Sequence, residues 1–250
     1  MLNNLSLFLA LSASTLVSAS PIVTTASQTQ AACCTSASST SQGFRLVAKT
    51  TDPFHQLADK VEGTVLEAFH AGVNYRVPIL RKPDDQNPGR IFYFDKPPQN
   101  SSTALLTDSS ATDESNSGPA VSYGLSVQSP TDFIWPEYPQ EHGVSFLVGG
   151  SNSGTPVSMA NMNTPFRGLF VLNDQGSGTF TACNRTIPYY DMRSDITLEY
   201  LYNGSDLPDG CVPIRLVPVC ADLPAVPPGS LASHEYVQPA SCYNNINGTP

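Results

Sequence analysis

The chain has 250 residues, of which 13% are charged, and its formal net charge is −9. Its 22 Pro and 17 Gly residues argue against long helices and coiled coils, because both residue types interrupt a regular helix. Residues 1–96 hold 8 basic and 7 acidic groups, whereas residues 97–250 hold 4 basic and 14 acidic groups. A duplex-binding surface needs clustered cations, so this distribution argues against nucleic acid and against an anionic membrane surface as partners.

The N-terminus has the composition of a secretory signal peptide. Leu5–Val17 is an apolar run that is too short to span a bilayer, which takes about 20 residues. Small residues follow at the positions that a signal peptidase reads, and the pattern predicts a signal peptide over residues 1–19, cleaved after Ala19. We therefore expect a protein that is secreted to the extracellular medium or the cell wall, without a membrane anchor.

A stalk is predicted to follow the signal peptide. Residues 20–42 carry no charge, and 11 of these 23 residues are Ser or Thr. Such a segment cannot bury enough apolar surface to offset its ordering entropy, so we expect it to be disordered. Cys33 and Cys34 lie within it, and three arrangements are open for them: an intermolecular bridge, a vicinal disulfide, or a bridge that pins the arm onto the domain.

Residues 43–250 are predicted to form a single all-β domain. The first strand is expected at Phe44–Thr50, which alternates partly in polarity and is rich in β-formers. Val61–His70 also fits a helix, but Gly63 and Thr64 at its centre favour a strand. The other expected strands are Asn74–Leu80, Arg90–Phe94, Ala104–Thr107, Ser122–Val127, Val144–Val148, Val157–Met162, Leu169–Leu172, Thr179–Cys183, Ile196–Tyr202 and Cys211–Pro218. About eleven short strands between turn sequences are typical of an antiparallel β-sandwich or barrel.

Two segments of this domain have a biased composition. Residues 97–119 are rich in Ser and acidic groups and predict a long low-complexity surface loop, although the strand candidate Ala104–Thr107 falls inside it. Residues 224–239 are Pro-rich and predict a tail that crosses back over the domain. Cys242 is expected to anchor the end of this tail.

Four cysteines lie in the last third of the chain: Cys183, Cys211, Cys220 and Cys242. Cys211 and Cys220 are nine residues apart on one predicted strand, a span of about 30 Å when extended. A disulfide needs Cα atoms within about 7 Å, so these two are not expected to pair with each other unless Pro213 and Pro218 fold the stretch back. In a meander of the last strands, the favoured pairing is Cys183–Cys211 and Cys220–Cys242.

Two features of the sequence point to carbohydrate: sequons for N-glycosylation and aromatic residues that could bind sugars. Four sequons predict N-glycosylation of a secreted chain, at Asn100, Asn184, Asn203 and Asn247. Exposed aromatic rings can stack on sugar faces, and the candidates are Trp135, Tyr138, Tyr189 and Tyr190. The alternative is that these rings belong to the core.

No catalytic, metal-binding or cofactor-binding motif is recognisable. The four histidines have no zinc-site spacing, and the adjacent pair His234-Glu235 is expected to be solvated on a loop. The glycine-flanked segment 150–154 lacks the central Ser of a nucleophile elbow. Asp84-Asp85 fits a polar turn better than the paired carboxylates of a glycosidase. We therefore expect no enzymatic activity, no cofactor and no metal.

Six segments carry a family resemblance: FRLVAKTTDP, GRIFYFD, SYGLSV, GTFTACN, GCVPIRLVPVCADL and SHEYVQPASCY. Through them the chain, from Phe44 to Tyr243, resembles a family of uncharacterised secreted proteins of filamentous ascomycete fungi, sometimes labelled IgE-binding protein. The resemblance implies secretion, an all-β domain and the four late cysteines, and it supplies no catalytic residues. The stalk with Cys33-Cys34 and the acidic insert depart from it.

Together these patterns predict a secreted, glycosylated, non-catalytic extracellular or cell-surface protein whose biochemical activity the sequence does not name. Binding of glycans or cell-wall material is the candidate activity. The main alternative is a secreted hydrolase that acts on polysaccharide with dispersed carboxylates. A structural wall protein is the third class. A cleft that gathers carboxylates or histidines would be the observation that separates them.

Overall fold

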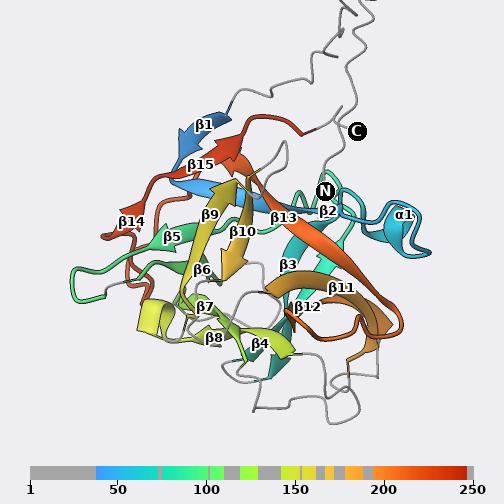
Figure 1. The fold of residues 1–250 in the computed structure, drawn as a ribbon. Coiled ribbons are helices and arrows are strands. Elements are labelled where there is room, and N and C mark those ends of the chain that lie inside the picture. The colour runs from blue at the N-terminus through green and yellow to red at the C-terminus, as the bar shows by residue number, and fades with distance from the viewer. Residues whose placement is uncertain are drawn as a thin grey trace, which may run out of the picture. The chain divides into compact units, whose positions relative to one another are not determined.

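The structure is a computed structural model, and it describes residues 38–72, 75–100, 102–109, 119–128, 142–152, 154–161, 167–171, 178–187 and 194–246. Within these residues the chain forms fifteen strands, one short α-helix and one 3-10 turn (Figure 1). The predicted all-β class is therefore confirmed. The predicted signal peptide, Cys33 and Cys34 lie outside the described residues.

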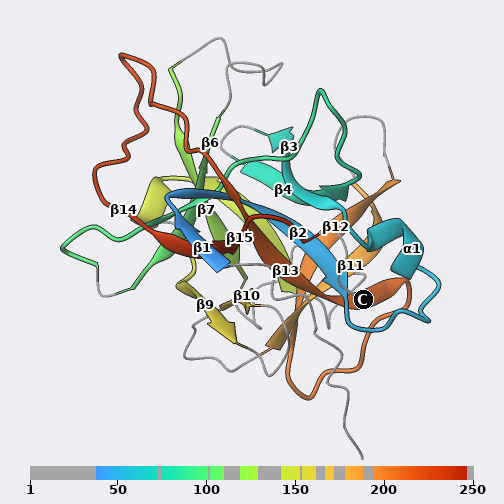
Figure 2. The ribbon, with the colours of Figure 1, turned by 90° about the horizontal axis from the view of Figure 1, so that it is seen from above.

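Six strands form a closed circuit. They are β2 (Gly43–Thr50), β3 (Val65–Gly72), β4 (Tyr75–Arg81), β12 (Ser194–Tyr202), β11 (Gly178–Thr186) and β13 (Cys211–Ala221). Each pairs antiparallel with the next, and β13 pairs in turn with β2, beside which it lies in both views (Figures 1 and 2). Pairing that returns to its first strand is the connectivity of a barrel.

A second antiparallel series leaves this barrel at β8 (His142–Val148), which pairs with both β4 and β12. It continues through β7 (Ser122–Val127), β6 (Ala104–Asp108), β5 (Tyr93–Asp95) and β14 (Val237–Gln238). Bridge pairing of Phe44 with Phe92, the residue before β5, holds the far part of this series against β2. The remaining elements are β1 (Ser38–Ser41), α1 (Ala58–Val61), the 3-10 turn η1 (Gly150–Asn152), β9 (Val157–Asn161), β10 (Arg167–Val171) and β15 (Ala240–Tyr243).

The main core gathers side chains from both the barrel and the second series. Phe44 and Leu46 of β2 enter it together with Phe92 and Phe146, and all four side chains are fully buried. Alternate residues of a strand point to opposite faces, so Val47 packs in a second, smaller cluster on the other side of β2. Burial of each large apolar side chain stabilises the fold by about 1.5–3 kcal/mol. Both faces of β2 are thus fixed, and its position decides where Arg45 lies.

All the predicted strands occur, with shifted ends. Val61–His70 is divided, because α1 ends at Val61 and strand β3 begins at Val65. Of the predicted strand Arg90–Phe94, only the part from Tyr93 onward lies in β5. These differences arise where the chain turns between one hydrogen-bonded pairing and the next.

Three strands were absent from the prediction, and two predicted segments need correction. Residues 38–42 belong to the ordered domain rather than to a disordered stalk, because the backbone of β1 pairs with β15 over four residues, Ser38 to Ser41. Residues 97–119 are not a continuous loop, because β6 lies within them and buries Leu105 and Leu106. Backbone pairing needs no apolar side chains, which is why the Ser-rich β1 gave no strand signal.

Two tyrosines of the barrel should make the folded protein less stable at alkaline pH. Burial, together with the charge of Glu199, raises the pKa of Tyr75 to about 12; burial, together with Tyr202, raises the pKa of Tyr200 to about 12. An unfolded chain ionises tyrosine near pH 10, so above that pH the unfolded state has lost protons that the folded state keeps. The stability from these groups is complete below pH 10 and should fall by on the order of 2 kcal/mol per tyrosine as the pH rises to about 12.

Urea denaturation at a series of pH values from 8 to 12 measures this loss. The variant Tyr75→Phe has no phenol to ionise at that position and should lose less stability over the same range. A free energy of unfolding that stays flat up to pH 12 in the wild type would contradict the assignment.

Candidate functional site

A cleft of about 820 Å³ lies between the sheets and the C-terminal segment. One side comes from β2, β3, the loop before β5 and the end of β6, and the other comes from residues 223–230. We call residues 222–236, which run between β13 and β14, the strap; Figure 2 shows them as the red segment joining these strands. The volume falls within the range of about 300–1,000 Å³ that is typical of small-molecule sites.

A histidine and an aspartate fasten the strap to the second series. Nε2 of His234, in the strap, lies 2.7 Å from Oδ2 of Asp108 at the end of β6. The other carboxylate oxygen accepts hydrogen bonds from the Tyr93 hydroxyl at 2.7 Å and from Ser122 Oγ at 2.9 Å. The rings of Tyr93 and His234 meet edge to face at 4.7 Å. Burial and the neighbouring carboxylate raise the pKa of Tyr93, which keeps its hydroxyl a donor.

This cluster differs from a nucleophilic triad. In a serine-type triad the second ring nitrogen of the histidine is hydrogen-bonded to the attacking hydroxyl. Among the residues that the structure describes, no hydroxyl or thiol is hydrogen-bonded to Nδ1 of His234. The arrangement therefore fits the attachment of the strap rather than acyl transfer.

The cleft also contains a strand arginine that is oriented by a glycine. Nε of Arg45 donates a hydrogen bond of 3.1 Å to the carbonyl of Gly89. Gly89 has φ of 102°, and a Cβ at this position would lie 2.8 Å from Cβ of Val65. Only glycine combines this backbone conformation with such close packing, and the packing fixes the carbonyl that holds Arg45.

A second arginine links two strands across the cleft. Nη1 of Arg90 donates a hydrogen bond of 2.7 Å to the carbonyl of Asp108, and its Nε lies 3.9 Å from Oε2 of Glu67. Both the Arg90 and Glu67 side chains are largely buried. Their charges therefore offset each other within the cleft.

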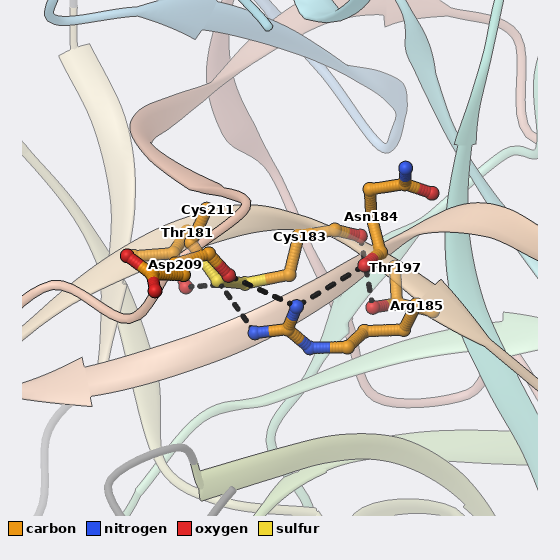
Figure 3. The surroundings of a disulfide bond; sticks show 7 residues. All are labelled: Thr181, Cys183, Asn184, Arg185, Thr197, Asp209 and Cys211. Carbon is orange, nitrogen blue, oxygen red and sulfur yellow. Dashed lines mark hydrogen bonds between the residues drawn. A yellow bond between two sulfur atoms is a disulfide. The ribbon is translucent and has the colours of Figure 1, made fainter.

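A third polar cluster surrounds the disulfide between Cys183 and Cys211 (Figure 3). Nη2 of Arg185 lies 3.0 Å from Sγ of Cys211, and its Nη1 donates to the carbonyl of Asp209 at 3.2 Å. Thr197 Oγ1 donates to the carbonyl of Cys183. Both cysteines are fully buried, so this cluster is closed to ligands and ties the turn before β13 to β11.

The structure contains the two disulfides of the favoured pairing, Cys183–Cys211 and Cys220–Cys242. The sequon residues Asn184 and Asn203 are exposed, Asn100 is half-buried, and Asn247 lies outside the described residues. The four proposed stacking residues also lie outside the described residues: Trp135, Tyr138, Tyr189 and Tyr190. Glycosylation and stacking thus stay predictions.

The sequence did not reveal the residues of the cleft. Of the pair His234-Glu235, Glu235 is exposed as expected, but His234 is half-buried and bound to Asp108. Asp108 lies 126 residues away in the chain, so local sequence could not reveal this contact. Asp84 does lie in an exposed turn, where its carboxylate accepts hydrogen bonds from the backbone of Gln86 and Asn87. Within the described part of the chain, no group of three His, Cys, Asp or Glu side chains could hold a metal ion.

Removal of the Asp108 carboxylate should destabilise the domain. Asp108→Ala would leave the buried Tyr93 hydroxyl without its charged acceptor and would release His234. Hydrogen bonds to charged groups contribute about 1.5–3 kcal/mol each, so we expect a loss of about 2 kcal/mol in the free energy of unfolding. Urea denaturation measures this loss, and Asp85→Ala in the exposed turn is the matched control. A loss below about 0.5 kcal/mol, the usual range for surface changes, would show that the Asp108 cluster does not stabilise the fold.

Fold and cleft together define a class: an all-β, disulfide-bonded protein with a ligand-sized cleft under a C-terminal strap. Within the described residues, no helix is long and apolar enough to cross a membrane. A family model described as "Domain of unknown function (DUF7907)" matches residues 41–220, and the chain belongs to this family. The match includes Arg45 and Asp108 but ends before the strap.

A curated relative is the "Antigenic protein SchS34" of Stachybotrys chartarum. It is 29% identical over 224 residues, which cover 84% of this chain and 90% of that protein. The predicted resemblance to an uncharacterised fungal family is thereby confirmed. No solved structure matches the chain.

Proposed function

We propose that this protein is a secreted, non-catalytic binding protein whose ligand occupies the cleft between the barrel and the strap. The observation that carries the proposal is a cleft of about 820 Å³ whose polar groups are already held by hydrogen bonds. Groups fixed in advance reduce the entropy lost on binding. Secretion is supported by the two disulfides, which persist in oxidising compartments, and by the N-terminal apolar run.

A variant that fills the cleft tests this proposal. Ala120 lines the cleft and is half-buried, so Ala120→Trp should occupy its space. Asp206 is exposed and is not among the residues that line the cleft, so Asp206→Trp is the control. A thermal-shift screen of metabolites and oligosaccharides should give ligands that stabilise the wild type and the control but not Ala120→Trp.

The ligand should be recovered unchanged by mass spectrometry after prolonged incubation. A screen without any ligand, or ligands that stabilise Ala120→Trp equally, would overturn the proposal. Conversion of the ligand would overturn its non-catalytic part.

Glycan binding by ring stacking is a separate hypothesis. It rests on Trp135, Tyr138, Tyr189 and Tyr190, which lie outside the described residues, rather than on the cleft. A glycan array that compares the wild type with Trp135→Ala tests it. Equal signals from both proteins would remove Trp135 from the hypothesis.

One observation favours the hydrolase alternative, because the cleft gathers two carboxylates, Glu67 and Asp108. A glycosidase uses such a pair as acid and base or nucleophile. However, both oxygens of Asp108 already accept hydrogen bonds from protein groups. Release of reducing ends from polysaccharide by the wild type, abolished in Glu67→Gln, would favour the hydrolase over the binding protein.

A further inference from the structure

We propose that the ligand of the cleft is an amphipathic carboxylic acid, whose carboxylate binds Arg45 and whose apolar body lies against the prolines. This inference rests on the proposed binding function and names the chemical class of the ligand. It follows from the pairing of charges in the cleft, the orientation of Arg45 and the composition of the walls.

The charges that line the cleft leave one cation without a carboxylate. Arg90 is paired with Glu67, and Asp108 is bound to His234. Among the described residues, Arg45 has a single hydrogen-bond partner, the carbonyl of Gly89, and no ion pair. Its two terminal nitrogens can therefore bind a ligand. A guanidinium binds a carboxylate through two parallel hydrogen bonds, which adds both strength and orientation.

Arg45 is also held in place before any ligand arrives. Its neighbours Phe44 and Leu46 are fully buried, so the backbone of β2 is fixed at this point. The contact of Nε with Gly89 orients the guanidinium, and Gly89 itself packs tightly against Val65. A binding group on a rigid strand with a supporting hydrogen bond is the arrangement that gives a precise site.

The walls of the cleft favour an apolar body over a sugar. Five prolines line it: Pro88, Pro119, Pro224, Pro227 and Pro228. Proline rings are rigid and have little side-chain entropy to lose when an apolar group packs on them. Among the lining residues Tyr93 is the one aromatic side chain described, and it is fully buried and bound to Asp108. The described walls thus offer no free ring face for a sugar.

Isothermal titration with two matched probes tests the inference. Decanoate and decan-1-ol share the same chain and differ in the charged head group. We expect decanoate to bind the wild type about ten- to a hundredfold more tightly than decan-1-ol, because hydrogen bonds to charged groups contribute about 1.5–3 kcal/mol. Arg45→Gln should weaken decanoate binding by a similar factor and leave decan-1-ol unchanged. Arg45→Lys, which keeps the charge but loses the planar fork, should give an intermediate affinity.

The matched control is Arg215→Gln. Arg215 is a half-buried arginine on the neighbouring strand β13, and it is not among the residues that line the cleft. This variant should bind both probes as the wild type does, and unchanged melting temperatures would establish that all the variants are folded.

The outcomes separate this inference from the proposed function. Equal affinity of the wild type for the two probes, or decanoate binding that is unchanged in Arg45→Gln, would overturn the carboxylate assignment. If neither probe binds but other compounds bind and are lost in Ala120→Trp, the inference fails and the binding function stands. If no compound of any class binds the wild type, both fail.

Discussion

Gly124→Ala should destabilise the domain by about 3 kcal/mol or more, at or above the upper end of the usual range for overpacked cores. Gly124 lies in β7, where it pairs with Leu106 of β6 and Leu147 of β8. A Cβ at this position would lie 2.5 Å from the carbonyl oxygen of Gly150 and 3.1 Å from the backbone of Gly154. Because these neighbours are backbone atoms, no side-chain rotation can relieve the collision.

The turn over β7 would have to move, and with it η1, which packs on β6 and β7. Urea denaturation of the purified variant measures the loss, and thermal unfolding should show a lower midpoint. Ser126→Ala is the matched control, because Ser126 lies two residues further along the same strand and therefore on the same face. A Gly124→Ala variant as stable as Ser126→Ala would show that the turn over β7 can shift without a loss in the free energy of unfolding.

Loss of the Cys220–Cys242 disulfide should lower the free energy of unfolding by about 3 kcal/mol. The bond closes a segment of 22 residues that contains the whole strap. In the chain-entropy model, a loop of roughly this size removes about 3 kcal/mol of conformational freedom from the unfolded state. At about 2–4 °C per kcal/mol for a chain of this size, the melting temperature should fall by about 6–12 °C.

The double variant Cys220→Ser/Cys242→Ser is the suitable form, because it leaves no new free thiol. Its strap should also become sensitive to proteases. Few side chains anchor the strap: His234 is bound to Asp108, Leu223 packs against the cluster of Tyr93, and Ala232 is buried. Leu231 is 76% exposed and is held through its backbone N–H, which donates to the carbonyl of Ala120.

The comparison variant is Cys183→Ser/Cys211→Ser, which removes the other disulfide, with a separation of 28 residues. It should lower the melting temperature by a similar amount while the strap stays resistant to proteases at temperatures where the protein is folded. An unchanged melting temperature in Cys220→Ser/Cys242→Ser would show that β14, β15 and the His234–Asp108 contact hold the strap by themselves.

The two disulfides therefore have different consequences for the proposed site. The bond at Cys183 lies inside the barrel circuit and supports β11 and β13. The bond at Cys220 closes the segment that contains the strap, and we expect it to keep the strap over the cleft. Under the proposed function, ligand binding should be lost with the second bond and retained with the first.

The sequence by itself indicated the all-β class, the positions of most strands and the favoured pairing of the four late cysteines. The β-rich, apolar composition of β2 and β7 and the turn sequences that bound the strands are local properties of the chain. The separation of Cys211 from Cys220 on one predicted strand also argued against their pairing with each other. These features follow from spacing along the chain, which the sequence contains in full.

The tertiary structure alone decided β1, the closed circuit and the cleft. The Ser-rich β1 is held through backbone hydrogen bonds to β15, and these depend on no particular side chain. His234 meets Asp108 across 126 residues, and Arg45 meets Gly89 across 44. Such contacts arise from the order in which strands pair. Spacing along the chain carries no signal of that order, so the residues that line the cleft became visible as a site only in the folded protein.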